Sequence, residues 1–365
     1  MEPSQVAESR GKIGGRIFSE TPLLVYWELT RACDLACQHC RAEAMNRRDP
    51  CELGLSEAKA LIRQIRSFGD PAPHLVLTGG DPLKWPGFFK LLEYGTSLKL
   101  RLSVAPSGTY NLTRDVIRRL KFSGVNSISL SLDGSSPERH DAFRGVPGCF
   151  DWTIQATHFA HEAGLPLQVN TLVTADTLED LPRIYRLMTE LDIIRWSLFF
   201  LIPVGRGRLL GEIIPQQCEA LHQWLYDLSK ETPFAIKATE APHFRRVTWL
   251  RMRAEGREID SIWRSPVGMG FGVRDGNGIM FISHTGDVYP SGFLPLATGN
   301  VRESSPVEIY RNSELFRSIR DPRNYRGKCG RCEFNGICGG SRARAYAKTG
   351  DYLASDPLCP YQPIE

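Results

Sequence analysis

The sequence predicts an α/β fold in which a partial (βα)6 barrel is followed by a smaller α+β domain. Segments typical of strands and of helices alternate six times along the first part of the chain, which favours a parallel sheet joined by crossover helices. Glycine and small polar residues recur directly after the strands, at the edge where barrels of this type carry their sites. Beyond about residue 270 the pattern changes to short strands and turns, which indicates a second domain.

The six barrel strands are expected from their apolar and aromatic content. They lie at 23–28, 74–78, 101–105, 127–132, 167–173 and 195–202. Helical patterns separate them, at 56–68, 88–98, 113–123, 150–163 and 178–191. Ser56 and Thr113, each followed by an acidic residue, are expected at the starts of their helices. Because a closed barrel of this type has eight strands, six units predict a barrel that is open on one side.

The part of the chain that follows the sixth strand is expected to carry two amphipathic helices and then a hairpin. The helices are predicted over 216–229 and 243–256. The hairpin begins at residue 278, with Thr285, Gly286 and Asp287 at its tip. These features divide the chain into a polar leader, the barrel, a helical bridging segment and the C-terminal domain. Their limits are 1–20, 21–214, 215–270 and 271–365.

Composition and charge exclude several classes of protein. The 365 residues carry 45 Lys and Arg against 41 Asp and Glu, and this net charge of +4 is too small and too evenly spread to indicate a nucleic-acid partner. No uncharged apolar run reaches the roughly 18 residues of a membrane span, and the N-terminus lacks the apolar region of a signal peptide. We therefore expect a cytoplasmic protein with no membrane or nucleic-acid partner.

Ten cysteines are unusual in a chain that is expected in a reducing compartment. Clustered cysteines in such a compartment bind metals more often than they form disulfides. Seven of the ten fall into two clusters at opposite ends of the chain. Cys51, Cys149 and Cys218 stand alone and are interpreted as ordinary core or surface residues.

The first cysteine cluster, Cys33-x3-Cys37-x2-Cys40, lies in the loop after the first strand. Three thiolates suit an iron–sulfur cube with one iron left open. A zinc knuckle is the alternative, although no fourth cysteine lies nearby. The segment TRACDLACQHCRAEA resembles the signature of the radical SAM superfamily, with His39 in the aromatic position before the third cysteine. The resemblance implies a [4Fe–4S] cluster whose open iron chelates S-adenosylmethionine and whose electron cleaves it to a 5′-deoxyadenosyl radical.

The loop after the second strand, Gly79-Gly80-Asp81-Pro82, resembles the GGEP motif of the same superfamily, which holds the methionyl amino group. Asp81 replaces the commoner glutamate and still offers carboxylate oxygens. Without the cysteine loop this motif would be interpreted as a generic glycine-rich turn, but both motifs follow strands in the order of the superfamily. Further cofactor contacts implied by the resemblance are Ser107, Ser131, Arg144, Asn170 and Gly205.

A second cysteine cluster lies near the C-terminus. Its members are Cys329, Cys332, Cys338 and Cys359. Four thiolates fit either zinc or a second [4Fe–4S] cluster. After a radical SAM barrel, the arrangement resembles the SPASM/twitch extension, which implies an auxiliary iron–sulfur cluster. Ser291 and Ser341 stand where related sequences often have cysteine, so one auxiliary site of a full SPASM domain is expected to be absent. A closed set of four thiolates favours electron transfer, and a structural role is the alternative.

Within the superfamily, the chain resembles the heme-synthesis branch along nearly its whole length. Segments that carry this resemblance include SISLSLDG, KATEAPHF, FISHTGDVYPSGFL and GKCGRCEF. It implies an oxidoreductase of a sister subgroup, which oxidatively modifies or decarboxylates a tetrapyrrole. The basic segment from residue 237 to 264 is then a candidate for contact with carboxylates, with Phe244 and Trp249 as flat contacts and His243 as an axial ligand of iron. A solvated helix face is the alternative.

Two other functions remain open from the sequence. Many proteins with this extension modify ribosomally made peptides, so a peptide maturase is the alternative within the enzyme class. A non-catalytic iron–sulfur or zinc protein, acting as a scaffold or redox sensor, is the alternative of another class. For an enzyme, the resemblance also implies an external electron donor such as a flavodoxin or ferredoxin.

Overall fold

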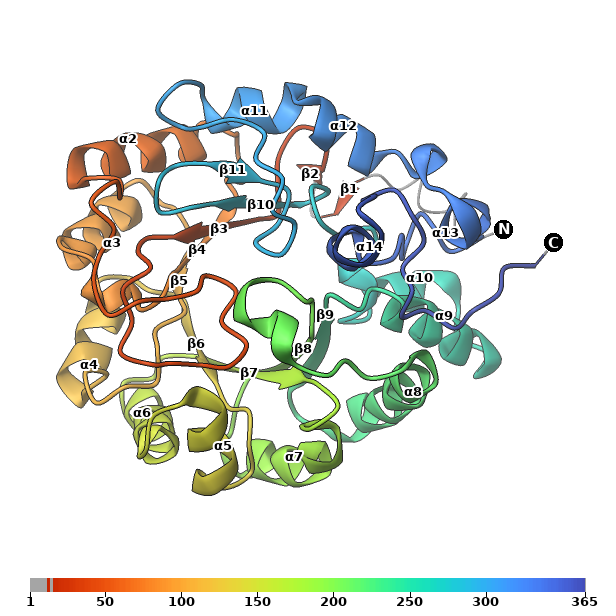
Figure 1. The fold of residues 1–365 in the computed structure, drawn as a ribbon, viewed down its shortest axis with the longest axis horizontal. Helices are drawn as coiled ribbons and strands as arrows, with labels where there is room; N and C mark the ends of the chain where they lie inside the picture. The colour runs from red at the N-terminus through yellow and green to blue at the C-terminus, as the bar shows by residue number, and fades with distance from the viewer. Residues whose placement is uncertain (1–11, 14–15, 365) are drawn as a thin grey trace.

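The computed structural model describes residues 12–13 and 16–364. Within these residues the main sheet has nine strands in the order β11-β10-β3-β4-β5-β6-β7-β8-β9. Neighbouring strands are parallel except β10 and β11. Figure 1 shows the strands as an open ring with most of the helices outside it. Most of the polar leader at 1–20 lies outside the described residues; β1 (Lys12–Ile13) and β2 (Arg16–Ile17) pair within it.

The six strands expected from the sequence are present and adjacent in the sheet. They are β3 (Leu24–Glu28), β4 (His74–Thr78), β5 (Leu102–Val104), β6 (Ser127–Ser131), β7 (Leu167–Val173) and β8 (Arg195–Phe200). The helices between them are α2 (Leu55–Arg66), α3 (Phe88–Ser97), α4 (Arg114–Phe122), α5 (Pro137–Arg144), α6 (Cys149–Glu162) and α7 (Leu181–Glu190). Only α5 was not expected from the sequence.

Two of the helix starts were predicted from single residues, and one of these predictions is wrong. Thr113 caps α4, since its hydroxyl accepts a hydrogen bond from the amide of Val116 at 3.3 Å. Ser56 lies inside the first turn of α2. The cap there is Gly54, whose amide donates to the carboxylate of Glu57 at 2.7 Å. The hydrogen-bond acceptor at this helix start is therefore the carboxylate of Glu57 and not the hydroxyl of Ser56.

Two further strands extend the sheet beyond the six that were predicted. After α8 (Pro215–Glu231), β9 (Ala235–Thr239) pairs in parallel with β8. At the opposite edge, β10 (Ile279–Ile282) pairs in parallel with β3 and antiparallel with β11 (Val288–Tyr289). The predicted hairpin is therefore present with its tip at the expected residues, and its first strand is also part of the barrel wall.

The remaining helices belong to the bridging segment and the C-terminal part. They are α9 (Phe244–Ala254), α10 (Ile259–Arg264), α11 (Pro306–Asn312), α12 (Glu314–Arg320), α13 (Gly327–Arg331) and α14 (Arg342–Thr349). The start of α14 joins the two ends of the ring. Arg344 donates to the carbonyl oxygen of Glu240, directly after β9, at 2.7 Å. The amide of Ala343 donates to Asp275, shortly before β10, at 3.0 Å.

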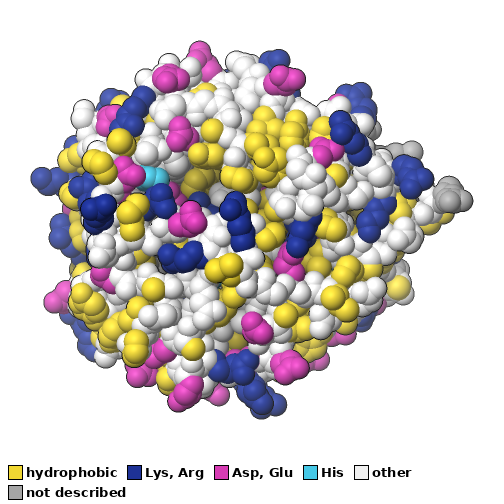
Figure 2. Space-filling model, viewed as in Figure 1, with side chains coloured by type: hydrophobic (Ala, Val, Ile, Leu, Met, Phe, Trp, Pro, Cys, Tyr) yellow, Lys and Arg dark blue, Asp and Glu magenta, His cyan; other side chains and the backbone are white. Residues whose placement is uncertain are grey.

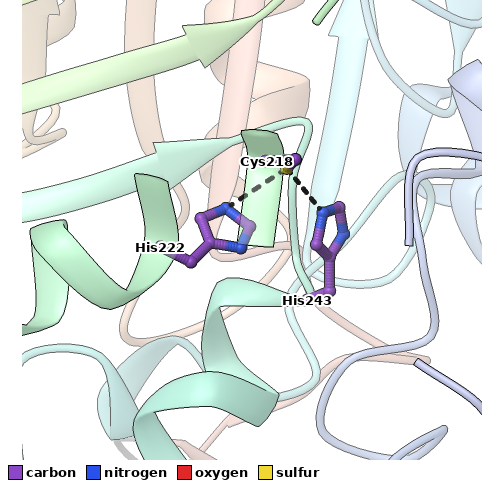
Figure 3. A group of neighbouring side chains, drawn as sticks. All are labelled: Cys218, His222 and His243. Atoms are coloured by element: carbon purple, nitrogen blue, oxygen red, sulfur yellow. Dashed lines mark hydrogen bonds between the residues drawn. The ribbon is translucent and has the colours of Figure 1, made fainter. Parts of the chain in front are cut away.

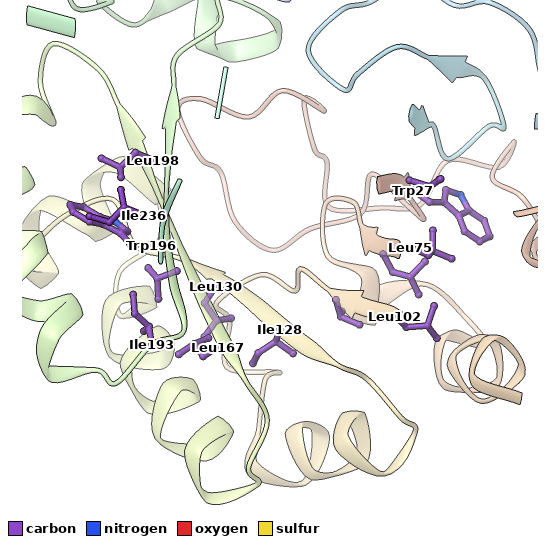
Figure 4. Close-up of a cluster of buried hydrophobic side chains, with 14 of the residues drawn as sticks. Trp27, Leu75, Leu102, Ile128, Leu130, Leu167, Ile193, Trp196, Leu198 and Ile236 are labelled. Atoms are coloured by element: carbon purple, nitrogen blue, oxygen red, sulfur yellow. The ribbon is translucent and has the colours of Figure 1, made fainter. Parts of the chain in front are cut away.

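The two faces of the barrel strands differ in chemistry. Apolar side chains such as Trp27, Leu75 and Trp196 point outward and pack under the helices, where they form the main core (Figure 4). The alternate residues point into the ring, where Ser129, Asn170 and other polar side chains replace the branched apolar side chains that fill closed barrels of this type. The inside of the ring is therefore a cavity lined by both polar and apolar side chains.

The described helices and the surface charges bear on the expectations for membrane and nucleic-acid partners. None of the described helices is both long and apolar enough to cross a membrane. On the face shown in Figure 2, Lys and Arg side chains are interspersed with Asp and Glu side chains.

Candidate active site

The cavity inside the ring has a volume of about 430 Å³, within the range of sites for cofactors and small molecules. It extends from the cysteine loop at the carboxyl ends of the strands to His74 and Arg195, at the beginnings of β4 and β8. Side chains from all strands between β3 and β9, together with the segment before β10, contribute to its wall. A cofactor at one end and a substrate at the other can therefore share this space.

Cys33, Cys37 and Cys40 all line the cavity, and none of them is in a disulfide. Backbone hydrogen bonds fix their loop: the amide of Cys33 donates to Met45 at 2.8 Å, and the guanidinium of Arg206 donates to the carbonyl oxygen of Cys37 at 2.9 Å. Burial raises the pKa of Cys33 to about 11. A bound metal ion stabilises the thiolate form of such a group.

The two glycines after β4 lie directly against the cysteine loop. A Cβ atom on Gly79 would be 2.5 Å from the carbonyl oxygen of Thr30, and one on Gly80 would be 2.5 Å from that of Ala32. The amide of Gly80 donates to Thr30 at 2.7 Å. Glycine is required because any side chain would push the cysteine loop away from the sheet.

This packing leads to a stability prediction for Gly80→Ala. We expect the free energy of unfolding to fall by about 1–3 kcal/mol, since the methyl group overlaps backbone atoms that cannot move freely. Chemical denaturation of the anaerobic protein measures this change. Gly270→Ala is the control, because a Cβ atom there meets nothing within 4 Å. An equal loss in both variants would contradict the close contact.

Asp81 is fully buried beneath the same loop. One carboxylate oxygen accepts from the amide of Leu83 at 3.2 Å and so caps the short helix Pro82–Lys84. The other oxygen, Oδ2, has no partner among the described residues, and burial raises the pKa of Asp81 to about 6. An unpaired buried carboxylate oxygen suits an incoming ammonium group. Gly79 and Gly80 line the cavity, whereas Asp81 and Pro82 are not among its described lining residues.

Four of the other predicted contacts also line the cavity: His39, Ser107, Ser131 and Asn170. Ser107 donates to the carbonyl oxygen of Gly80 at 2.8 Å, and its hydroxyl lies 3.2 Å from the sulfur of Cys33. The ring of His39 stacks on Phe143 with centroids 4.9 Å apart. Burial and the nearby charge of Arg144 lower the pKa of His39 to about 4, so it is neutral at pH 7.

Arg144 and Gly205 have protein partners that the sequence did not suggest. The guanidinium of Arg144 lines the cavity, but it forms an ion pair with buried Asp133 and lies 3.5 Å from the sulfur of Cys37. Gly205 has a φ of +52°, and a Cβ atom there would be 2.6 Å from the carbonyl oxygen of Cys40. Both residues therefore support the cysteine loop.

The cavity also contains a group of cations that sequence reasoning did not single out as a group. These are Arg195, Lys237, Arg245 and Arg274. None of them has a carboxylate oxygen within 4.0 Å among the described residues. Burial, together with the charges of Arg195 and Arg245, lowers the pKa of Lys237 to about 8. This wall is therefore prepared for an anionic ligand.

Glu240 and Asp275 form a buried acidic pair beside these cations. Glu240 follows β9 with a φ of +60°, a strained conformation for a residue with a side chain. Its carboxylate accepts from the hydroxyl of Ser341 at 2.6 Å. Burial, and then the charge of Asp275, raises the pKa of Glu240 well above its ordinary value. Backbone strain and a raised carboxyl pKa are features that cluster at functional sites.

The interpretation of His243, Phe244 and Trp249 as substrate contacts is wrong for this structure. His243 is fully buried and Phe244 and Trp249 nearly so, and none is among the described residues that line the cavity. The rings of His243 and Phe244 pack on His222 of α8, and the ring of Trp249 packs on Phe271. Of the basic side chains of this segment, Lys237 and Arg245 alone line the cavity among the described residues.

The four C-terminal cysteines line a second, separate pocket, together with Arg246 and Lys328. Burial raises the pKa of Cys332 to about 12 and that of Cys359 to about 11. Amides and a guanidinium point at the sulfurs: the amide of Asp356 lies 3.4 Å from Cys329, and that of Gly340 lies 3.4 Å from Cys338. Such donors fit sulfur that carries negative charge in a cluster.

Ser291 and Ser341, the two serines at expected cysteine positions, both line the main cavity rather than this pocket. Tetrahedral zinc would bring four sulfurs to about 3.8 Å from one another. Among the described residues, however, no three of the seven clustered cysteines have sulfur atoms that all lie within 4.8 Å of one another. Their spacing favours a cluster over a single zinc ion.

Comparison with known proteins agrees with this geometry. Residues 27–188 match the model of the radical SAM superfamily, and residues 274–333 match that of an iron–sulfur cluster-binding domain known as SPASM. Among curated proteins, an AdoMet-dependent heme synthase of Methanosarcina barkeri is 41% identical over 94% of this chain and 98% of its own. An Fe-coproporphyrin III synthase of the same organism is 28% identical over 92% of this chain and 87% of its own.

A solved structure of Streptococcus suis SuiB bound to precursor peptide SuiA has the same fold. Its TM-score is 0.72 over 94% of this chain and 76% of that chain, with 20% identity. The fold, the motifs and these matches define an iron–sulfur enzyme that depends on S-adenosylmethionine. The chain belongs to the radical SAM superfamily, in the branch that contains the AdoMet-dependent heme synthases.

Proposed function

We propose that this enzyme oxidatively modifies a carboxylated tetrapyrrole, with decarboxylation of a propionate side chain as the reaction. The similarity to AdoMet-dependent heme synthases supports the substrate class. The observation that carries the proposal is the cationic wall of the cavity, formed by Arg195, Lys237, Arg245 and Arg274, which has no carboxylate oxygen within 4.0 Å among the described residues. A tetrapyrrole presents several carboxylates around a flat apolar ring, and Phe199, Phe281 and Phe293 line the same cavity.

We propose that Cys33, Cys37 and Cys40 hold a [4Fe–4S] cluster at the other end of the cavity. The unpaired oxygen of Asp81, the nearby glycines and the remaining predicted contacts suit the methionine and nucleoside parts of S-adenosylmethionine. When bound, this pair of cofactors supplies a radical that abstracts hydrogen from substrate. The protein's contribution is to hold the substrate carbon near that radical and to exclude water.

We propose that the four C-terminal cysteines hold a second [4Fe–4S] cluster, which supplies an acceptor for the electron that leaves the substrate. Along the chain, residues 21–214 form the cofactor-binding barrel, 215–270 the bridging segment with part of the substrate wall, and 271–365 the auxiliary domain. A cytoplasmic location, with a flavodoxin or ferredoxin as the donor, is consistent with ten unpaired cysteines.

The proposal is tested by incubating anaerobically reconstituted protein with reductant, S-adenosylmethionine and iron-coproporphyrin III. Mass spectrometry of the pigment is expected to show loss of carboxyl groups, with 5′-deoxyadenosine formed in step. The same assay with metal-free coproporphyrin, or with peptides, separates this substrate class from the alternative of a peptide maturase. Formation of 5′-deoxyadenosine with the pigment unchanged would contradict the substrate assignment.

Lys237→Met gives a specific prediction for the cationic wall. Loss of one charge-assisted contact worth about 1.5–3 kcal/mol should raise KM for the tetrapyrrole by roughly ten- to a hundredfold. Because the pKa of Lys237 is about 8, KM of the wild type should also rise as pH increases through 8, where the lysine loses its charge. In the variant this pH dependence should disappear. Exposed Lys90→Met is the matched control, and an equal KM for both variants would contradict the role of Lys237.

A further inference from the structure

A second group of metal-binding side chains lies outside both cysteine clusters. Cys218, His222 and His243 are fully buried, and their ligand atoms all lie within 4.8 Å of one another. Figure 3 shows that the two rings point toward the sulfur from different segments. Cys218 and His222 are one turn apart on α8, and His243 immediately precedes α9.

The distances within this group are close to those around a single ion. The sulfur of Cys218 lies 3.0 Å from Nε2 of His243 and 3.9 Å from Nε2 of His222. Tetrahedral zinc with ordinary bond lengths places sulfur and nitrogen ligands about 3.6 Å apart. Small side-chain rotations therefore suffice to centre an ion among the three atoms.

The hydrogen bonds of the two histidine rings are incomplete among the described residues. The Nδ1 atoms of both histidines are buried without a hydrogen-bond partner among the described residues. A neutral imidazole carries one N–H group, and a buried N–H group without an acceptor is costly. Nε2 of each ring faces the sulfur of Cys218, so an ion there would take up the Nε2 lone pairs and keep the N–H group of each ring on Nδ1.

The surroundings of His243 match those of a metal ligand. Its Nδ1 atom lies 3.8 Å from a carboxylate oxygen of Asp356, which is itself held by the amide of Ser341 at 2.8 Å. Histidines that bind metals through one nitrogen usually donate the other N–H to such a carboxylate. A shift of about 0.6–1 Å on metal binding would complete this hydrogen bond.

Nearby cations do not rule out an ion at this position, because acids accompany them. Arg246 pairs with Glu219 at 2.5 Å, and Arg344 lies 3.5 Å from Asp356. Burial and these cations hold the pKa of His222 and His243 well below the ordinary value.

We propose that Cys218, His222 and His243 bind one Zn²⁺ ion, with a small ligand such as water in the fourth position. The donor set of one sulfur and two imidazoles suits zinc. The ion would tie α8 to the loop between β9 and α9. This loop carries Glu240 of the cavity wall, and the carboxylate beside His243 belongs to the segment that leads to Cys359. The zinc is structural and fixes the wall between the cavity and the C-terminal cysteines.

Metal analysis of the cluster-loaded wild-type protein tests the proposal. After exposure to Zn²⁺ and desalting, we expect about one zinc per chain in addition to the iron of both clusters. Cys218→Ser should lower the zinc content at least about tenfold and leave the iron content unchanged. Cys51→Ser, which removes an exposed lone cysteine, should retain the zinc. Equal zinc in Cys218→Ser and wild type would place the metal in a cysteine cluster and overturn the proposal.

Cobalt provides a measurement that does not depend on the folding of a variant. Co²⁺ in place of Zn²⁺ should give the wild-type holoprotein a thiolate-to-cobalt absorption band and the visible bands of a tetrahedral site. His222→Gln should abolish them. A wild-type holoprotein that takes up neither ion would show that the three side chains interact only through hydrogen bonds, and would overturn the proposal.

Discussion

Cys37→Ala is expected to abolish cleavage of S-adenosylmethionine. The sulfur of Cys37 lines the cavity and receives a contact from Arg144, and its loop is fixed by Arg206. A cube that loses one of three thiolates is no longer held with an open iron toward the cofactor. Iron should fall from about eight to about four per chain, and 5′-deoxyadenosine should fall below detection in an anaerobic assay with reductant.

A nearby cysteine provides the control for this experiment. Cys149 is fully buried in the same apolar cluster as Cys37, but it is not among the residues that line the cavity. Cys149→Ala should keep the iron content and the cleavage activity of the wild type. If Cys37→Ala still produced 5′-deoxyadenosine at the wild-type rate, the assignment of the cysteine loop to the cofactor cluster would be wrong.

Cys332→Ala is expected to separate cofactor cleavage from product formation. The C-terminal pocket is distinct from the cavity, so loss of its cluster should leave the cysteine loop intact. Without an acceptor for the substrate electron, 5′-deoxyadenosine should still form, while decarboxylated product should fall by at least about a hundredfold. Both products are measured in the same reaction by liquid chromatography and mass spectrometry.

An exposed cysteine outside both clusters provides the control for Cys332→Ala. Cys51→Ala removes an exposed cysteine that lies in neither cluster, and it should behave as the wild type. Undiminished product formation by Cys332→Ala would remove the electron-transfer role and leave the C-terminal cysteines a structural one. Parallel loss of cofactor cleavage and product would instead mean that the two parts of the chain fold as one unit.

The barrel could be predicted from the sequence because its signals are local. Apolar runs such as those of β3 and β7 are bounded by turn residues, and the helices between them carry clear periodicity. The cysteine loop and Gly79-Gly80 were also identifiable, since each is contiguous in the chain. The structure adds the reason for the glycines, which is the close passage of the loop at Thr30 and Ala32.

Features formed by distant segments could not be predicted in this way. The strand β9 has only five residues, and Lys237 and Thr239 interrupt its apolar pattern because they face the cavity. The pairing of β10 with β3 joins residues about 255 positions apart. The interpretation of His243 failed because no local pattern in the chain indicates that Cys218 and His222 lie beside it. The role of His243 can be inferred only when the residues packed around it in the fold are known.

The pairing of β10 with β3 also sets the earliest point in synthesis at which this part of the barrel wall can be complete. During synthesis, β3 emerges early, but its partner on one side is made only with the last quarter of the chain. Until then the edge of β3 next to the cysteine loop exposes unpaired backbone groups. The bonds of α14 to both ends of the ring form later still. A nascent chain therefore completes the wall around the cavity only after the residues of β10 and the start of α14 have been made.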